Sequence, residues 1–496
     1  MFGLYLRSKR SWSASALISL LSGRLIYPLH ERLLGRRTFP FWRSLETSQW
    51  DSPDGLYRLQ AEKLDALLTH ARTNVEFYRD RLPHAARDGQ AGDPLAALRD
   101  VPFLERSDIR ENINAMLWQA SPGGLFPGCT GGSTGEPVRF FLDRRRQAFD
   151  QAARLRAHRW FGVNPGDREL YLWGSPIEKN RTDTLKNWRD ALFNQRLLDA
   201  FNMSAARLDQ YLDAWDAFRP ACLFGYPSSI ALLVQHAQRR GRELRRKQLR
   251  AVFVTGEVCL PQDRKVIADY FGVPVADGYG SRDAGFIAHQ CPEGGMHVTA
   301  ENVVVEIVEE ERQVPVGESG EIVTTHLDAY GMPMIRYRTG DRGRLLADRC
   351  RCGRGLPLMD VVQGRTTDFL RLPDGNVRHA LSIIYPLRET PGIRQFRVVQ
   401  ERDFGVVVEV VCDGRAAQVT RESVSRSLRP VIGADVSLDV RTVDYIEPSP
   451  SGKHRYVTSR VVSVPSEPPA PACGQNDPSP SADTIVATST ESLHAR

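Results

Sequence analysis

The stretch that decides the fold is residues 129–140, which read CTGGSTGEPVRF. Glycine loses more conformational entropy on folding than other residues, so a glycine-rich loop needs a physical reason. The usual reason is close approach of backbone N–H groups to an anion, most often a phosphate. The loop lacks the Lys-Ser/Thr ending of a Walker motif. It predicts either a plain surface loop or a cradle for the β- and γ-phosphates of a nucleotide, formed by Thr130, Gly131, Gly132, Ser133, Thr134 and Gly135.

Composition places the chain among soluble globular proteins of two or three domains. It has 496 residues, with 66 Lys and Arg against 60 Asp and Glu, and a net charge of +6. Beyond residue 43 the chain is close to neutral, which argues against a broad nucleic-acid surface. Eight cysteines in a long chain without an export signal indicate a reducing compartment. We therefore expect a cytoplasmic protein.

The N-terminal arm, residues 1–44, is basic and amphipathic. Residues 1–43 hold eight Lys and Arg, a single acid (Glu31), and many leucines and aromatic residues. No apolar run in the chain approaches the ~20 residues that span a bilayer. Two interpretations stay open: peripheral contact with the inner face of a membrane or a membrane-bound partner, or a helical arm packed on the body.

The rest of the chain divides into three parts. Short apolar runs alternate with helical patterns over residues 45–366, which predicts a large α/β body with layered sheets. Residues 367–463 follow a strand, strand, helix, strand rhythm that predicts a small α+β domain. Residues 464–496 are rich in Pro, Ser and Ala and have almost no large apolar side chains, so we expect this tail to be disordered.

Five further motifs follow the glycine-rich loop in order. Any one of their residues alone is more often structural or solvated than functional, and only the joint order singles them out. They are VTGEV with Gly256 and Glu257, DGYGSRDAG with Tyr279, Gly280, Ser281 and Asp283, IRYRTGDRGRL with Arg336, Arg338 and Asp341, GRTTDFL with Arg365 and Asp368, and PSPSGKHRYV with Lys453.

With these motifs the chain resembles the adenylate-forming superfamily. Within it, the chain is similar to the phenylacetate–CoA ligase family, especially the branch linked to capsular polysaccharide genes. The segments SQWDSPDGLYRLQAEKL, FGYPSSI and MPMIRYRTGD extend the resemblance over residues 45–462. It implies an α/β fold with a small mobile C-terminal domain. It also implies an enzyme that joins a carboxylic acid to the α-phosphate of ATP, with Mg²⁺, and then transfers the acyl group to CoA.

The resemblance also implies a role for each motif. Two anions must meet in this reaction, so neutralising charge is the main task. The glycine-rich loop would hold the departing phosphates, Tyr279 would stack on the adenine, and Gly256 and Glu257 would form the opposite wall. Asp341 would bind the two ribose hydroxyls, and Arg365 the ribose and phosphates. Lys453 would bridge the carboxylate and the α-phosphate.

Two positions depart from the family pattern. Asp283 stands where the superfamily commonly has a glutamate that serves Mg²⁺, so the placement of the metal could differ. Thr367 stands where an acid usually marks the hinge of the small domain. The roles of Arg336 and Arg338 stay open between site residues and ordinary strand charges. The acyl pocket is expected to draw on three aromatic residues, although core packing is commoner for such side chains: Trp173, Phe224 and Tyr226.

Two short segments contain candidate zinc ligands. CPEGGMH supplies Cys291 and His297, and CRCGRG supplies Cys350 and Cys352. Three thiolates and one imidazole make an established structural zinc site, and four protein ligands leave no open catalytic position. The alternative is three unconnected thiols and a surface histidine.

Three functions compete at this point. The first is an acid–CoA ligase. The second keeps adenylation but passes the acyl group to an amine or sugar hydroxyl in cell-surface polysaccharide or natural-product assembly. The third is a non-catalytic nucleotide-binding module, against which Lys453, Asp341 and Arg365 argue. A homodimer is compatible with each of them.

Overall fold

The computed structural model describes most of the chain, and the described residues all lie within the compact unit Met1–Val461. They are residues 14–82, 94–129, 138–174, 189–200, 203–244, 247–309, 311–363, 369–412, 417–444, 446 and 456–461. The phosphate-loop residues 130–135, the segment 365–368, Lys453 and the tail 464–496 fall outside this set. What the sequence predicts about those residues therefore stays a prediction.

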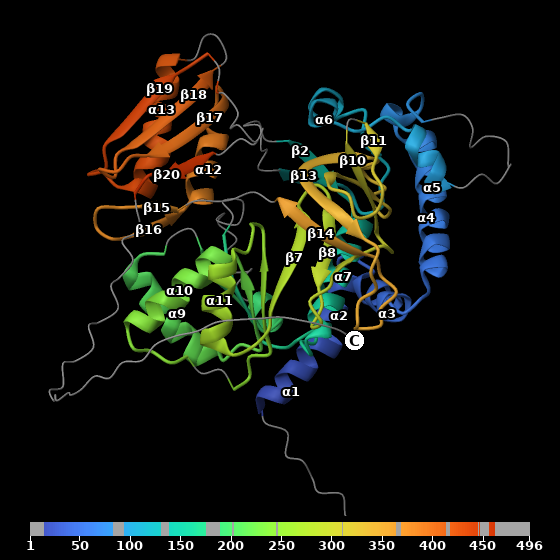
Figure 1. Cartoon of the computed structure of the whole chain (residues 1–496), viewed down its shortest axis with the longest axis horizontal. Coiled ribbons are helices and arrows are strands. Elements are labelled where there is room, and N and C mark those ends of the chain that lie inside the picture. Colours follow the sequence, from blue (N-terminus) through green and yellow to red (C-terminus); the bar gives the residue numbers. More distant parts are fainter. Residues whose placement is uncertain are drawn as a thin grey trace, which may run out of the picture. The chain divides into compact units, whose positions relative to one another are not determined.

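The described residues up to Asn112 are largely helical (Figure 1). The longest of these helices is α4, where Ser52 Oγ accepts a hydrogen bond from the Gly55 N–H and Pro53 occupies the first turn. No described helix has both the length and the apolarity that crossing a bilayer needs. The elements are α1 (Ala14–Leu21), a π-helical turn (Ser22–Ile26), α2 (Tyr27–Leu33), α3 (Thr38–Ser48), α4 (Pro53–Asn74), 3₁₀ turns (Glu76–Tyr78 and Leu98–Asp100), α5 (Pro94–Ala97) and α6 (Arg106–Asn112).

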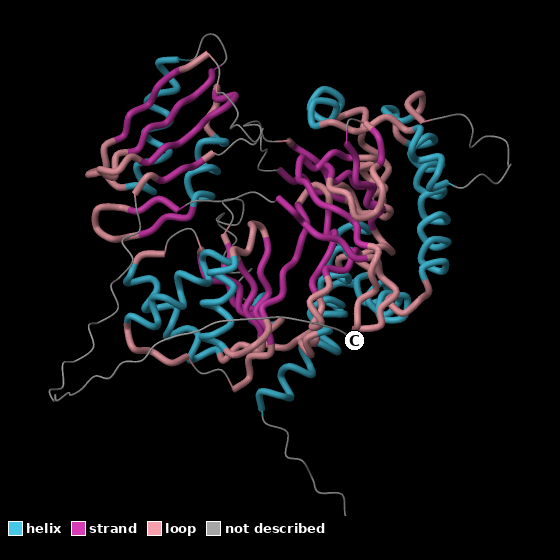
Figure 2. Tube along the Cα trace, in the orientation of Figure 1, coloured by secondary structure: helices cyan, strands magenta, loops and turns pink. Residues whose placement is uncertain are grey.

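The centre of the body is a parallel sheet with the strand order β4-β3-β5-β6-β7. Parallel strands need crossover connections, and helices α9, α10 and α11 supply those from β4 to β5, from β5 to β6 and from β6 to β7. These helices lie together against the strands (Figure 2). The strands are β3 (Glu169–Trp173), β4 (Gln195–Asp199), β5 (Cys222–Gly225), β6 (Ala251–Thr255) and β7 (Val275–Ser281), and the helices are α7 (Arg144–Trp160), α9 (Ala205–Phe218), α10 (Pro227–Arg239) and α11 (Pro261–Phe271).

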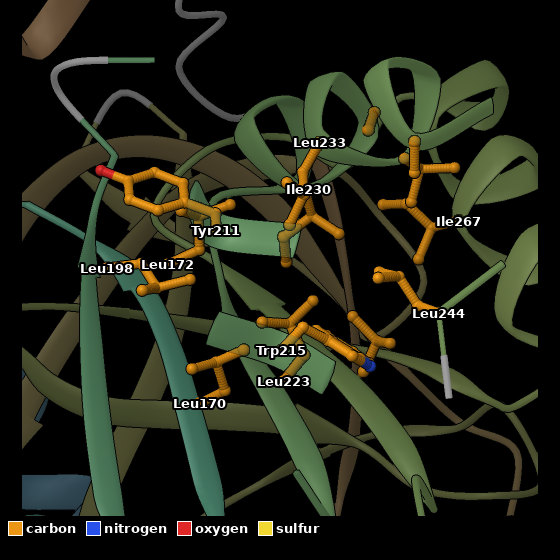
Figure 3. Packing of buried hydrophobic residues seen from close by; sticks show 14 of the residues in the cluster. Leu170, Leu172, Leu198, Tyr211, Trp215, Leu223, Ile230, Leu233, Leu244 and Ile267 are labelled. Atoms are coloured by element: carbon orange, nitrogen blue, oxygen red, sulfur yellow. The ribbon is translucent and has the colours of Figure 1, made fainter. Parts of the chain in front are cut away.

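Alternate side chains of the parallel strands enter two different cores. Leu223 and Val252 join a cluster with Trp215 of α9, which Figure 3 shows between the strands and the helices. Their neighbours Cys222 and Phe253 face the other way and join a smaller cluster. Because both faces are covered, the strands read as continuous apolar runs rather than as alternating ones.

An antiparallel half extends the same sheet beyond β7, in the order β7-β8-β9-β14-β13-β12-β10-β11. The two halves meet where β7 pairs antiparallel with β8, and within the antiparallel half β9 pairs with β14 at His297 and Leu358. These strands are β8 (Gly285–Gln290), β9 (Met296–Val298), β10 (Val303–Glu309), β11 (Arg312–Gln313), β12 (Gly320–His326), β13 (Tyr337–Leu346) and β14 (Leu358–Gln363), and a separate hairpin joins β1 (Phe126–Cys129) to β2 (Arg139–Leu142).

The described residues from 369 onward form a four-stranded sheet, a separate pair of strands (β15 and β16) and a core of their own. The strand order of the larger sheet is β19-β18-β17-β20, and the two predicted successive strands are present as the antiparallel pair β17 and β18. The exact domain boundaries stay predictions. The elements are β15 (Phe369–Arg371), β16 (Val377–His379), α12 (Ala380–Glu389), β17 (Ile393–Gln400), β18 (Val406–Cys412), α13 (Ala417–Ile432), β19 (Leu438–Thr442) and β20 (Val457–Ser459).

Two histidines are buried between α7 and the sheet. The ring of His158 stacks on Phe253 with centroids 3.9 Å apart, and the ring of His289 lies 6.3 Å from that of His158. Burial lowers the pKa of His158 to about 4 and that of His289 to about 3. Both rings are therefore neutral in the folded protein at neutral pH.

These histidines predict a loss of stability in mild acid. Between their unfolded pKa of about 6.5 and their folded values, the unfolded chain binds protons that the folded chain does not. Lowering the pH from about 7 to about 5 is therefore expected to reduce the free energy of unfolding by roughly 4 kcal/mol for the pair. Guanidinium unfolding at both pH values measures the effect. His289→Phe keeps a ring in place and should remove about half of this dependence; an unchanged dependence would contradict the assignment.

Candidate active site

The predicted site residues of the body gather at one edge of the parallel sheet. Trp173 ends β3, Tyr226 follows β5, and Gly256 follows β6. The strand order changes direction between β3 and β5. Ligands of open α/β sheets bind at the carboxyl ends of the strands, beside such a switch point. The sheet topology therefore places these residues where a ligand is expected.

Trp173 contacts both of the other predicted acyl-pocket aromatics at this edge. The rings of Trp173 and Tyr226 stack with centroids 4.1 Å apart and an interplanar angle of 15°. Phe224 lies 5.6 Å from Trp173, and the Tyr226 hydroxyl donates a hydrogen bond to the Gly174 carbonyl at 3.2 Å. Trp173 and Phe224 are partly exposed, whereas Tyr226 is buried. The cluster can offer an aromatic wall to a planar ligand.

Gly256 closes against this aromatic wall. Its φ is +86°, and a Cβ added there would lie 2.9 Å from Tyr226 Cε1 and 3.2 Å from Trp173 Cη2. Both the backbone conformation and the space therefore require glycine. The sequence placed Gly256 on the nucleotide wall, and the structure adds that it contacts the predicted acyl pocket as well.

Gly256→Ala is expected to lower stability and also to disturb the pocket. The left-handed backbone alone costs roughly 1–2 kcal/mol with a side chain. Gly272 is a matched control, because its φ is +64° and nothing lies within 4 Å of an added Cβ. Gly272→Ala should lower the free energy of unfolding only by the cost of placing a side chain on a left-handed backbone. Gly256→Ala should destabilise more in denaturant unfolding, and should raise KM for the acid by on the order of tenfold. Identical behaviour of the two variants would contradict the packing role.

Glu257 is fixed by the start of the neighbouring helix. Its Oε1 accepts hydrogen bonds from the backbone N–H of Ser228, at 2.9 Å, and from the Ser228 hydroxyl. Ser228 lies in the first turn of α10, where a carboxylate is stabilised by the helix dipole. Glu257 thus ties the loop after β6 to the loop that carries Tyr226.

Tyr279 and Asp341 meet across the two halves of the large sheet. Tyr279 lies in β7 and Asp341 in β13, and the Tyr279 hydroxyl donates a hydrogen bond to Asp341 Oδ2 at 3.1 Å. The backbone N–H of Asp341 donates a hydrogen bond to Thr339 Oγ1 at 3.1 Å, and this bond helps to fix the position of Asp341. The residues predicted for adenine and ribose are therefore neighbours, although 62 positions separate them in the chain.

Asp283 lies close by, and both of its carboxylate oxygens accept hydrogen bonds. Ser281 donates to Oδ1, and the Tyr337 hydroxyl donates to Oδ2 at 2.5 Å. Arg106 Nε in turn donates to the Tyr337 oxygen at 3.2 Å. Burial and Asp283 raise the pKa of Tyr337, so its hydroxyl stays protonated and donates. A direct contact between Asp283 and Mg²⁺ would compete with these bonds, and that role stays a prediction.

The two arginines left open by the sequence form ion pairs with acids of the body. Arg336 is buried and binds Glu306 through two contacts, Nε to Oε2 at 3.1 Å and Nη2 to Oε1 at 2.9 Å. Arg338 donates to Glu321 at 2.8 Å and to Glu105 at 3.1 Å. The structure therefore gives both arginines a structural function.

The four predicted zinc ligands come together beside the β9–β14 pair of the antiparallel half. All four ligand atoms lie within 4.8 Å of one another. Cys291 Sγ lies 3.5 Å from Cys350 Sγ, and Cys352 Sγ lies 3.2 Å from His297 Nε2. Two thiolates on one tetrahedral zinc are about 3.8 Å apart, given bonds of about 2.3 Å. The spacing and the donor types therefore fit zinc.

The surroundings of His297 support the same arrangement. Its Nδ1 lies 3.2 Å from the Leu356 carbonyl, which accepts the proton at that nitrogen and leaves Nε2 free to bind a metal. Burial lowers the pKa of His297 to about 4, so the ring is neutral. Gly295 lets its segment of the chain come close to Cys350, because a Cβ on residue 295 would lie 2.8 Å from Cys350 Sγ.

Sequence reasoning missed three residues of this region. Ser228 holds Glu257, and Tyr337 and Arg106 form the chain of hydrogen bonds to Asp283. Tyr337 lies inside the quoted motif IRYRTGD, so its position was available from the sequence. Arg106 had no such signal, because its partner lies 231 positions away.

Curated relatives match about two thirds of the chain at modest identity. Over 338 residues it is 25% identical to a phenylacetate–coenzyme A ligase of Thermus thermophilus, covering 65% of this chain and 73% of the relative. Over 345 residues it is 26% identical to a phenylacetate–coenzyme A ligase of Escherichia coli K12, covering 67% and 76%. No family model matches the chain.

A solved structure confirms the fold class. It is a 2-hydroxyisobutyryl-CoA ligase in complex with 2-HIB-AMP and CoA, with a TM-score of 0.55 and 21% identity, covering 81% of this chain and 89% of that one. At this identity the likeness concerns the fold alone. Taken together with the curated relatives, it shows that the chain is a relative of the phenylacetate–CoA ligases and has the fold of the adenylate-forming enzymes.

Proposed function

We propose that the chain is an AMP-forming acid–CoA ligase. The observation that carries this proposal is the convergence of Tyr279, Asp341 and the Trp173–Tyr226 pair on the carboxyl edge of the parallel sheet. It supplies an aromatic wall and a carboxylate at the position where open α/β sheets bind nucleotides. The names of the curated relatives support the same reaction.

The reaction would proceed in two steps. In the first, a carboxylate oxygen of the acid attacks the α-phosphorus of ATP, the bond to the β-phosphate oxygen breaks, and pyrophosphate leaves. In the second, the sulfur of CoA attacks the acyl carbon, its proton is lost to solvent, and AMP leaves. Mg²⁺ bound to the phosphates would supply charge neutralisation.

Each predicted site residue would bind or orient one reactant. Asp341 would accept hydrogen bonds from the ribose hydroxyls, and Tyr279 would lie against the adenine opposite Gly256 and Glu257. Asp283 would position the Mg²⁺ directly or through water. The remaining roles rest on the sequence motifs: the loop 130–135 for the β,γ-phosphates, Arg365 for the ribose and phosphates, and Lys453 for the reacting oxygens.

The acid is expected to carry an aromatic group. The stacked pair Trp173 and Tyr226, with Phe224 beside it, favours a planar substituent over a flexible chain. Gly256 keeps the backbone close to this wall.

An ATP–pyrophosphate exchange screen over aryl, fatty and amino acids tests this proposal. We expect exchange with one or more aryl-substituted acids, followed by a CoA thioester when CoA is added. Exchange without thioester formation, but with product formed on an amine or a sugar, would favour the alternative acceptor in polysaccharide or natural-product assembly. Absence of exchange with every acid would contradict the enzymatic function.

We propose in addition that Cys291, His297, Cys350 and Cys352 hold a structural zinc ion. The spacing of the sulfur and nitrogen atoms supports it, as does the orientation of His297. Four protein ligands would leave no open position for substrate, so the metal would serve folding rather than the reaction. The cytoplasmic location and the homodimer stay predictions.

A further inference from the structure

The N-terminal helical arm carries a row of exposed leucines on one face. They recur at intervals of four residues through α1, the π-helical turn and α2. Such a row on the surface of a globular protein marks a contact surface when it is contiguous. We call it the leucine row; its members, with their exposed fractions, are Leu17 (49%), Leu21 (44%), Leu25 (59%), Leu29 (51%) and Leu33 (77%).

The π-helical turn Ser22–Ile26 keeps this row in line. A repeat of four residues advances by roughly 40° around an α-helix at each step, so five leucines would spiral off one face. The i→i+5 bonds of a π turn make a wider turn with less rotation per residue. The turn therefore offsets the drift between the leucines of α1 and those of α2.

The opposite face of the arm is packed on the body. A Cβ on Gly23 would lie 1.8 Å from the Pro165 carbonyl oxygen, so only glycine allows this approach. The ring of Tyr27 stacks on Phe193 with centroids 4.7 Å apart. The arm is thus fixed by one face, and the leucine row is left on the other. Both interpretations of the arm left open by the sequence are compatible with this packing.

A cationic pocket of about 920 Å³ opens beside the arm. Of its charged lining residues, Arg250 pairs with Asp167 at 2.5 Å, and Arg159 pairs with Glu46 at 3.4 Å. The other cationic side chains that line the pocket form no ion pair with any residue in the described part of the chain. They are Arg24, Arg43, Arg168, Arg219 and Lys247.

The cationic pocket lies at the edge of the sheet opposite to the candidate active site. Arg168 directly precedes β3 and Arg250 directly precedes β6, so both stand at the amino ends of parallel strands. Trp173 and Gly256 stand at the carboxyl ends of the same two strands. A ligand at the pocket would therefore leave the candidate active site accessible from the other side.

We propose that the leucine row and the cationic pocket together bind the surface of an anionic lipid bilayer. The leucines would enter the interfacial region, and the pocket would receive an anionic headgroup. Charge favours this occupant over a second copy of the chain. Glu31, the only acid among residues 1–45, is buried and accepts a hydrogen bond from Thr38 at 2.6 Å. Two such cationic faces would repel each other.

Co-sedimentation of the full chain with vesicles tests the proposal. Vesicles of phosphatidylcholine alone are compared with vesicles that also contain phosphatidylglycerol. Binding is expected to need the anionic lipid and to weaken with salt. Leu25→Glu/Leu29→Glu should lower it on the order of 100-fold. Arg24→Gln/Arg43→Gln/Lys247→Gln should lower it by roughly 10- to 100-fold.

Matched variants control for exposure and for net charge. Val316 is as exposed as Leu25, at 58%, and lies in the antiparallel half, so Val316→Glu should bind like the unmodified chain. Lys265→Gln/Arg312→Gln/Arg402→Gln removes three charges elsewhere and should have little effect. All these variants should keep their rate of ATP–pyrophosphate exchange, which separates this proposal from the proposed function.

Three outcomes would overturn the proposal. The first is a lack of preference for the anionic vesicles, or no binding to either kind. The second is unchanged binding of the leucine and pocket variants. The third is a dimer in solution that Leu25→Glu/Leu29→Glu dissociates, because the leucine row would then be covered by a second copy of the chain.

Discussion

Lys453→Ala is expected to lower the rate of ATP–pyrophosphate exchange by on the order of 10²–10³-fold or more, while ATP binding stays largely intact. The carboxylate of the acid and the α-phosphate of ATP are both anionic, and their approach needs a cation between them. Lysine suits this role because its ammonium group is compact and its stem is long. The ground-state complex loses little without it, since phosphate binding would rest on the glycine-rich loop.

Lys265→Ala is the control for this experiment, because Lys265 is an exposed lysine whose described partner is Asp269, at 2.7 Å within the same helix. It should leave exchange unchanged. Exchange and ATP affinity are measured separately, so that a loss of folding is distinguished from a loss of the chemical step. If Lys453→Ala turned over at the original rate, Lys453 would have no part in the mechanism.

Cys350→Ser is expected to release zinc and to destabilise the large sheet. The purified protein should contain about one zinc per chain, and the variant much less. The proposed metal joins Cys291 and His297 to Cys350 and Cys352, across the place where β9 and β14 pair at His297 and Leu358. Structural zinc in small domains contributes about 10 kcal/mol or more to folding, so loss of even part of this should lower Tm strongly.

The same variant should also weaken ATP binding. Tyr279 lies in β7, which pairs with β8, and Asp341 lies in β13, which pairs with β14. The proposed zinc joins the segment between β8 and β9 to the segment between β13 and β14, so its loss would loosen the strands that carry both residues. Cys412→Ser is the control, since Cys412 lies in β18 and outside the cluster. Metal analysis, thermal unfolding and ATP affinity are the three measurements. A zinc-free protein with full activity and unchanged Tm would rule the site out.

Local patterns predicted the elements well because the signals for them are local. The apolar spacing in residues 206–218 predicts a helix, which is present as α9 (Ala205–Phe218), and the apolar runs on either side of Phe404 predict the hairpin β17–β18. The apolar spacing of residues 228–244 by itself predicts one continuous helix, but α10 ends at Arg239, where the Arg240 N–H still bonds to the His236 carbonyl and Gly241 follows with φ +61°. A glycine in the left-handed region ends a helix that the apolar pattern alone would extend.

The sequence also predicted the composition of the candidate site, although not all of its contacts. Motif order grouped Tyr279, Asp283 and Asp341 as one predicted site, and donor types singled out the four candidate zinc ligands. The bonds from Tyr337 to Asp283 and from Ser228 to Glu257 had no local signal. They join segments that only the folded sheet brings together, since a hydrogen bond between distant residues leaves no periodicity in either segment.

By itself, the sequence determined which residue types are available: a glycine-rich loop, a lysine near the end, a Cys₃His set and an arm with leucines and arginines. The tertiary structure alone decided that Arg336 neutralises the buried Glu306 and that Gly256 contacts the predicted acyl wall. It also placed the leucine row beside a cationic pocket at the other edge of the sheet. The reason is physical: composition and spacing report what a segment can do alone, whereas burial, charge pairing and exposure depend on what the fold packs against it.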